Sequence, residues 1–237
     1  MSQFSFDSDN RFVIRDYHRQ PAFASFLPGI AGLMGIPLWV FYVNRGQAIA
    51  SFGIESKDVP VVEFQPANKA YQTVTATGFR TFIKTAESAS TVYEPFGAYL
   101  PEPDAVQRQM AIGMNDLLLT EQHDRHDLRV AVRYFTLTDE PLAGLVRQVT
   151  ITNTGQTAQS LQVVDGLPVI APYGMTDDLL KNMARTAEAW MGVFSAGPDV
   201  PFYRLRSSIA DSVEVTGYEA GHFYVTVTGG GDRLPVL

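Results

Sequence analysis

The composition of this 237-residue chain excludes several classes of protein. The formal net charge is -7, from 18 basic and 25 acidic residues, which argues against binding to nucleic acid or to an anionic membrane, because both require a cationic surface. The chain has no cysteine, so disulfides and cysteine-ligated zinc sites are excluded. With 46% hydrophobic residues it can form a large core, and we expect a single domain over residues 1–237.

The N-terminal part of the chain shows neither a signal peptide nor a membrane helix. The first residues lack a basic region followed by an apolar run, so we expect a cytoplasmic protein. Residues 26–43 carry no charge, but Pro28 and Pro37, with three glycines between them, would make a poor helix. We instead expect a hairpin: a strand over 38–43, a turn at 44–46 and a returning strand over 48–54.

Short segments of alternating apolar and polar residues predict many further strands. In one of them Leu128, Val130, Val132 and Tyr134 fall on one face. Turn signals at intervals of about ten residues indicate an all-β sandwich or barrel. The expected strands cover residues 11–16, 59–65, 70–84 (two strands broken at 77–78), 91–99, 108–120, 127–138, 145–152, 161–164, and a final hairpin of 212–217 with 222–228.

One segment, residues 176–191, predicts an amphipathic helix. Thr176 can cap its N-terminus, and Asp177 and Asp178 suit the positive end of the helix dipole. Apolar residues recur there at helical spacing, and Gly192 is the expected stop.

Three groups of residues could carry chemistry, and for each we favour a structural role. His123 and His126 could hold a metal, but residues three apart on a strand face opposite ways, so we favour a charged loop. Glu63 and Glu94 could form the carboxylate pair of a glycosidase, or a buried glutamate could pair with Arg80 or Lys69. His18 and His222 could act as a mutarotase-like acid and base, but we favour surface or structural histidines. We therefore expect no catalytic residue, no metal and no cofactor.

Aromatic residues concentrated in the first hundred residues suggest a sugar site. Sugars present apolar CH faces and hydroxyls, so their sites combine aromatic rings with polar side chains. The alternative is that most of these rings fill the core. The apolar segment 97–119 could also be a docking surface. The expected carbohydrate-binding residues are Trp39, Tyr42, Asn44, Arg45, Gln65 and Tyr71.

Four segments resemble a known family. They are SFLPGIAGLMGIPLWVFYVNRGQAIASFGIESKD, EFQPANKAYQ, RYFTLTDEPLAGLVRQVTITNTG and LLKNMARTAEAWMGV. They resemble the N-terminal region of bacterial inverting glycoside phosphorylases related to glycoside hydrolase family 94, with the 1,2-β-oligoglucan phosphorylases as the nearest branch. The resemblance implies a large two-sheet β-sandwich, similar to the galactose-mutarotase-like supersandwich, as a domain that precedes an (α/α)6 barrel absent from this chain.

The resemblance also implies a role. In the family the barrel supplies an aspartate as general acid, and inorganic phosphate cleaves the glycosidic bond with inversion to give a sugar 1-phosphate. The sandwich supports the barrel and takes part in a homodimer interface. The implied partners are therefore an oligosaccharide (a β-glucan, with β-1,2 linkages in the nearest branch), the catalytic domain of the same protein and a second copy. A stand-alone carbohydrate-binding sandwich and a mutarotase-like aldose epimerase remain the alternatives.

Overall fold

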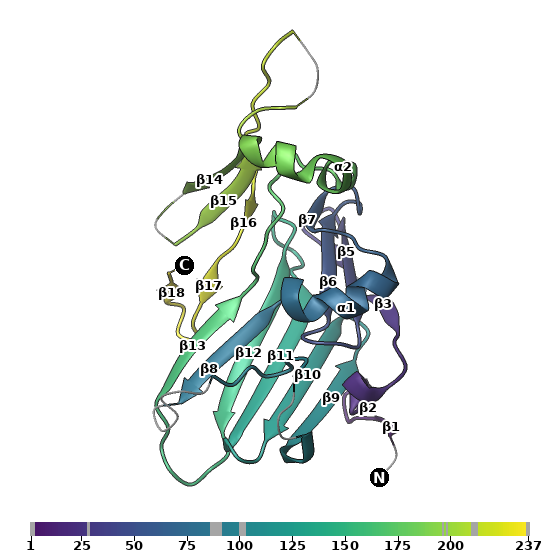
Figure 1. Ribbon diagram of the computed structural model, residues 1–237, viewed down its shortest axis with the longest axis vertical. Helices are drawn as coiled ribbons and strands as arrows, with labels where there is room; N and C mark the ends of the chain where they lie inside the picture. The colour runs from purple at the N-terminus through teal and green to yellow at the C-terminus, as the bar shows by residue number, and fades with distance from the viewer. Residues whose placement is uncertain are drawn as a thin grey trace. The chain divides into compact units, whose positions relative to one another are not determined.

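The computed structural model describes residues 3–27, 29–85, 92–99, 103–195, 197, 199–209 and 213–235. The chain is all-β and sandwich-like, built from antiparallel sheets, and the expected fold class is confirmed (Figure 1). It divides into two compact units: residues 1–51 with 65–168, and residues 52–64 with 169–237. No helix among the described residues is long and apolar enough to cross a membrane.

A six-stranded antiparallel sheet forms the main layer of the first unit, in the order β1-β2-β9-β10-β11-β12. Alternation along β11 buries Leu128, Val130, Val132 and Tyr134, which confirms the face expected for this strand. The strands are β1 (Phe4–Phe6), β2 (Phe12–Arg15), β9 (Val106–Ile112), β10 (Asp116–His123), β11 (Leu128–Thr136) and β12 (Leu145–Asn153).

The described part of the segment 97–119 lies largely in the six-stranded sheet, although Tyr99 and Met114 are exposed; residues 100–102 lie outside the described part. Within it, β9 and β10 replace the single strand expected over 108–120, with a turn between them. Val106, Met110, Leu117 and Leu119 are all buried, because their positions alternate onto the inner face of the sheet.

A second layer in the first unit contains the expected hairpin. β5 (Ile36–Val43) is followed by a turn and by β6 (Ile49–Ile54), while β3 (Ala24–Leu27) and β4 (Ile30–Ala31) pair with β5. The end of β6 belongs to the second unit and pairs there with β7 (Pro60–Val62). A separate pair in the first unit joins β8 (Arg80–Thr85) to β13 (Leu161–Gly166).

The first of the two strands expected over 70–84 is wrong, because the structure has a helix there. α1 (Ala67–Thr77) starts after Pro66, and only β8 follows the expectation. Ala70 and Val74, four residues apart, are buried against Val43 and Ala50 of the second layer. Threonine is common in strands, but burial of this helical stripe outweighs its preference.

The second unit holds a three-stranded sheet covered on one face by a helix. β14 (Met191–Ser195), β15 (Pro201–Leu205) and β16 (His222–Phe223) form the sheet, and β17 (Thr226–Val227) pairs with β18 (Arg233–Leu234). A helix is present in the expected segment as α2 (Asp177–Ala187), with Thr176 accepting a hydrogen bond from the backbone N–H of Leu179. It ends before the expected Met191, and Gly192 lies within β14 and is not the helix stop. Short 3₁₀-helices occupy Tyr17–Arg19, Pro103–Ala105 and Glu188–Trp190.

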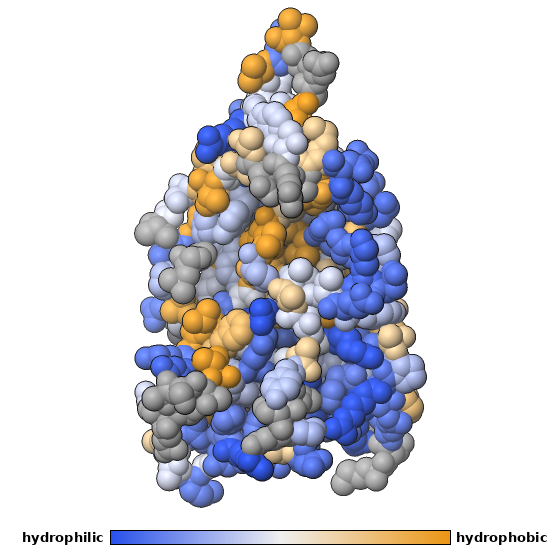
Figure 2. All heavy atoms as spheres, in the orientation of Figure 1, coloured by the Kyte–Doolittle hydropathy of each residue, from blue (hydrophilic) through white to orange (hydrophobic). Residues whose placement is uncertain are grey.

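The hairpin expected between 212–217 and 222–228 is wrong. Residues 210–212 lie outside the described part, and residues 213–217 form no strand. β16 pairs with β15 instead, because Phe202 and Phe223 meet across the two strands. Apolar side chains, including the exposed Val213 and Val215, lie on the long loop between β15 and β16 (Figure 2).

Candidate functional site

A buried ion pair lies on the inner face of the six-stranded sheet. Glu121 on β10 and Arg108 on β9 are cross-strand partners, and both are buried. The Arg108 Nε–H donates to Glu121 Oε2 at 2.5 Å. The Tyr93 hydroxyl donates to Oε1 at 2.5 Å, and the backbone N–H of Phe96 donates to Oε2 at 2.7 Å. The carboxylate is thus held by internal donors, which indicates a structural role.

A second polar network centres on Arg147 of β12. Its guanidinium donates to both oxygens of Asp165 on β13, to Gln47 Oε1 and to the Thr81 hydroxyl of β8. The Thr81 hydroxyl donates to Asp165 at 2.6 Å, and the Tyr134 hydroxyl donates to the Gln47 carbonyl at 2.9 Å. The network therefore ties the β8–β13 pair, the main sheet and the turn after β5 together.

Glu94 pairs with Arg80, one of the two pairings expected for a buried glutamate. Arg80 donates from Nε at 2.7 Å and from Nη2 at 3.0 Å to the two carboxylate oxygens. Together with Gln47, Phe79 and Phe96 the pair lines a shallow recess that encloses about 0 Å³ of space open to a water-sized sphere. Ligand pockets usually measure about 300–1,000 Å³, so this recess has no room for a sugar. Glu63 is half-buried after β7 in the second unit.

The expected carbohydrate-binding residues on β5 lie on opposite faces of the strand. Trp39 is 39% exposed and Tyr42 only 4% exposed, because residues three apart on a strand point opposite ways. Burial raises the pKa of Tyr42. Tyr42 therefore belongs to the core side of the sheet, and Trp39 to the outer side.

Trp39 belongs to a cluster of rings that we call the outer aromatic patch: Phe26, Trp39 and Phe41. Phe26 of β3 faces Phe41 of β5 in the strand register. The Phe26 ring centroid lies 5.5 Å from that of Trp39 and 5.1 Å from that of Phe41. Phe26 is 46% exposed, so the patch presents ring surface to solvent. Sequence reasoning missed Phe26, because its place in the patch depends on the register between β3 and β5.

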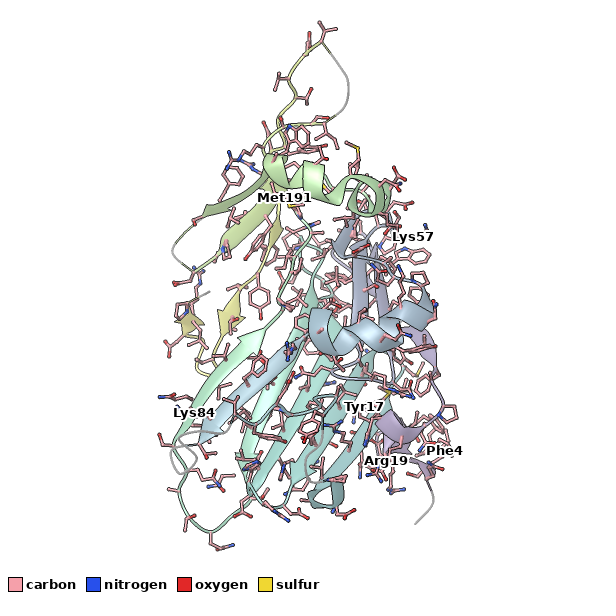
Figure 3. All side chains as sticks on the ribbon, in the orientation of Figure 1. Phe4, Tyr17, Arg19, Lys57, Lys84 and Met191 are labelled. Atoms are coloured by element: carbon pink, nitrogen blue, oxygen red, sulfur yellow. The ribbon has the colours of Figure 1, made fainter. Side chains whose placement is uncertain are left out.

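Asn44 and Arg45 hold the chain around the turn after β5. Asn44 is fully buried, accepts the backbone N–H of Phe23 at 2.9 Å and donates to the Tyr17 carbonyl at 3.0 Å. Arg45 donates to the carbonyls of Asn44 at 2.7 Å and Gln20 at 3.1 Å. Tyr17, whose carbonyl accepts a hydrogen bond from Asn44, is labelled in Figure 3. The polar groups of these two residues thus bond to backbone within the fold.

Gln65 lies just before α1, and Tyr71 lies on the helix. Gln65 is half-buried just before the helix. Tyr71 is half-buried and packs, with Phe41, against the cluster that joins α1 to β5. Since Phe41 and Trp39 share a face of β5, the structure brings Tyr71 to the same face as the outer aromatic patch.

His123 is buried, so the charged, solvated loop expected for it is wrong. It ends β10, and its ring centroid lies 4.2 Å from that of His126 and 5.0 Å from that of Tyr93. Among the described residues, no group of three or more histidine, aspartate or glutamate side chains could hold a metal ion.

His222 is also structural in its contacts. It is buried in the second unit, and its Nδ1 lies 2.7 Å from the carbonyl oxygen of Ala171. A carbonyl can only accept, so Nδ1 carries the proton. Burial lowers the pKa of His222 and favours this neutral form.

His18 gives the fold a dependence on pH. Burial lowers its pKa from 6.5 to about 4, and the charge of Arg108 adds to the effect. The unfolded chain therefore binds a proton between these pH values and the folded chain does not, so this contribution to stability is complete above pH 6.5 and is lost as the pH falls towards 4. We expect His18→Gln to flatten the decline of the urea midpoint over this range. An equally steep decline of the urea midpoint in the variant would contradict this assignment. We expect a smaller slope to remain, because burial also lowers the pKa of His222.

Two groups of side chains in the first unit were candidates for a functional site. Glu121, Glu94 and Asp165 accept hydrogen bonds from arginines, and of the three only Glu121 is fully buried. The outer aromatic patch faces outward and offers apolar ring surface. Comparison of the chain with models of known protein families and with curated protein sequences finds no match.

Proposed function

We propose that this chain is a non-catalytic β-sandwich domain that binds carbohydrate and supports the catalytic domain of a cytoplasmic glycoside phosphorylase. The observation that carries the proposal is the outer aromatic patch, in which Trp39 and Phe26 are each more than a third exposed and stand edge to face. The four resembling segments support the family, and the antiparallel, sandwich-like fold agrees with it. The substrate class that follows from the resemblance is β-1,2-gluco-oligosaccharides.

The chemistry of the patch suits a sugar. Apolar CH faces of a pyranose pack on aromatic rings, and each buried ring surface contributes through the hydrophobic effect. Tyr71 borders the same face of the sheet and carries a hydroxyl that can bond to sugar hydroxyls. A platform of a few rings without an enclosing pocket implies weak binding, with a Kd of about 1 mM.

The state of the carboxylates supports a non-catalytic role. Cleavage of a glycosidic bond needs a carboxylic acid that can donate a proton to the leaving oxygen. Glu121 and Glu94 each accept hydrogen bonds from an arginine, so neither carboxylate is free to approach a glycosidic oxygen. In the proposed assembly the general acid comes from the catalytic domain.

Replacement of Trp39 tests the sugar site directly. We expect the full chain to give saturable saturation-transfer NMR signals with β-1,2-gluco-oligosaccharides, and Trp39→Ala to weaken binding about 10-fold, because it removes a large ring from the platform. Trp190 is the other of the two tryptophans and packs on the buried cluster of the second unit, so Trp190→Phe is the matched control and retains binding.

Two results would contradict the proposed function. One is a wild-type chain that gives no saturable signal at concentrations well above about 1 mM. The other is unchanged affinity in Trp39→Ala. Release of sugar 1-phosphate from these oligosaccharides and inorganic phosphate by the chain alone would contradict the non-catalytic assignment.

A further inference from the structure

β14 is the outer strand of the three-stranded sheet, since among the described strands it pairs only with β15 (Figure 1). The backbone N–H of Arg206 donates to the carbonyl of Trp190 at 2.7 Å, so this facing pair is hydrogen-bonded. Hydrogen-bonded pairs alternate along an antiparallel ladder, so Gly192 and Phe194 also direct their backbone groups to β15. The backbone groups on the open edge then belong to Met191, Val193 and Ser195.

The open edge lacks the features that usually protect edge strands. β14 reads Met-Gly-Val-Phe-Ser and contains neither a charged residue nor a proline. Val193 is 65% exposed. Met191, which begins β14 where the preceding helical turns end (Figure 3), faces the cluster under α2. An exposed, uncharged edge of this kind is a template for pairing with another strand.

The opposite face of the sheet is aromatic. Phe194, Phe202 and Phe223 occupy one row across the three strands, with Phe202 and Phe223 ring centroids 6.2 Å apart. The Arg204 guanidinium lies 4.4 Å above the Phe194 ring. Phe194 and Phe223 are both more than a third exposed. A longer sheet would bury the end of this row as well as the open edge.

We propose that β14 pairs with β14 of a second copy of the chain, antiparallel and related by a two-fold axis at Val193. In this register Val193 faces the same residue of the second copy, and Met191 faces Ser195. All three facing pairs join residues whose backbone groups point to the open edge, so each pair exchanges two hydrogen bonds. On the aromatic face Gly192 lies opposite Phe194 of the second copy, and within each chain the Phe194 ring lies over its own Gly192.

The charges around the strand favour a second copy in this orientation. The turn from β14 to β15 carries Asp199, and the other end of the strand pair carries Arg204 and Arg206. In the antiparallel pair, the turn of each copy lies beside the arginines of the other. A parallel pair would place like charges together, which opposes association. The register pairs β14 with itself, and the two ends of the strand pair carry opposite charges. We therefore assign the open edge to a second copy of the chain.

Sedimentation of the full chain tests the pairing. We expect the mass to rise with concentration from 26.1 kDa towards twice that value. Val193→Lys places two ammonium groups at the axis and should weaken association more than about 10-fold. Val169→Lys is the matched control, because Val169 is 66% exposed in the same unit but is not part of β14, and it should associate like wild type.

A charge exchange separates this pairing from a folding defect. Val193→Glu alone should be monomeric, whereas an equal mixture of the Val193→Lys and Val193→Glu chains should regain the dimer mass, because opposite charges then meet at the axis. A wild-type chain that stays monomeric, a Val193→Lys chain that dimerises like wild type, or a mixture without dimer would each overturn the proposal. The sugar-binding test is independent, since Val193 and Trp39 lie in different units.

Discussion

Replacement of Arg108 by methionine is expected to lower the free energy of unfolding by about 3–5 kcal/mol. The variant leaves the Glu121 carboxylate buried without its cation, although Tyr93 and Phe96 still donate to it. Domains of this size are stable by about 5–15 kcal/mol, so the loss is a large share of the total. Urea denaturation followed by circular dichroism measures it.

Two variants test whether the buried charge is the cause. Arg129 is exposed on the outer side of β11, and Arg129→Met should change stability by no more than about 0.5 kcal/mol. Adding Glu121→Gln to Arg108→Met removes the unpaired charge but keeps an acceptor for Tyr93, so the double variant should be more stable than Arg108→Met alone. If the double variant is the less stable of the two, the loss comes from packing and not from charge.

Replacement of Arg147 by methionine is the second large effect, with an expected loss of about 3 kcal/mol. The variant removes the donor shared by Asp165, Gln47, Thr81 and Tyr134. The loss should be smaller than for Arg108, because Asp165 is partly exposed and water can reach it. Urea denaturation again gives the free energy.

Hydrogen exchange distinguishes this network from a general loss of stability. Asp165 and Thr81 lie on the β13–β8 pair, and Arg147 links that pair to β12. We therefore expect backbone amides of β8 and β13 to exchange faster in Arg147→Met, even at low denaturant. Gln148→Met, on the exposed side of β12, is the control and should leave exchange unchanged. Uniformly faster exchange over all strands would argue against a local link.

Local patterns predicted much of the fold. Alternation in β11 identified the buried face of Leu128, Val130, Val132 and Tyr134, since one face of this strand is buried and the other is not. The charge-free run ending at the turn of 44–46 predicted the β5–β6 hairpin, because its prolines and glycines exclude a helix. The sequence did not predict α1, because the buried stripe of this helix is short and its threonines favour strands.

The candidate site was predicted only in part. Aromatic composition singled out Trp39, and strand alternation alone could have placed Tyr42 on the opposite face. Phe26 required the register between β3 and β5, which local sequence does not contain. Asn44 was chosen for its polar amide, but the fold uses that amide to bind backbone carbonyls of a distant loop.

By itself, then, the sequence determined which segments can form strands and which faces of them are apolar, because side-chain period and turn chemistry are local properties. Only the tertiary structure decided which charges meet. Glu121 pairs with Arg108 because of the register of β9 and β10, and Arg147 donates a hydrogen bond to Gln47, which lies 100 residues away in the chain. Burial makes such pairing necessary, since an unpaired charge is costly there, but the identity of each partner follows from packing of distant strands.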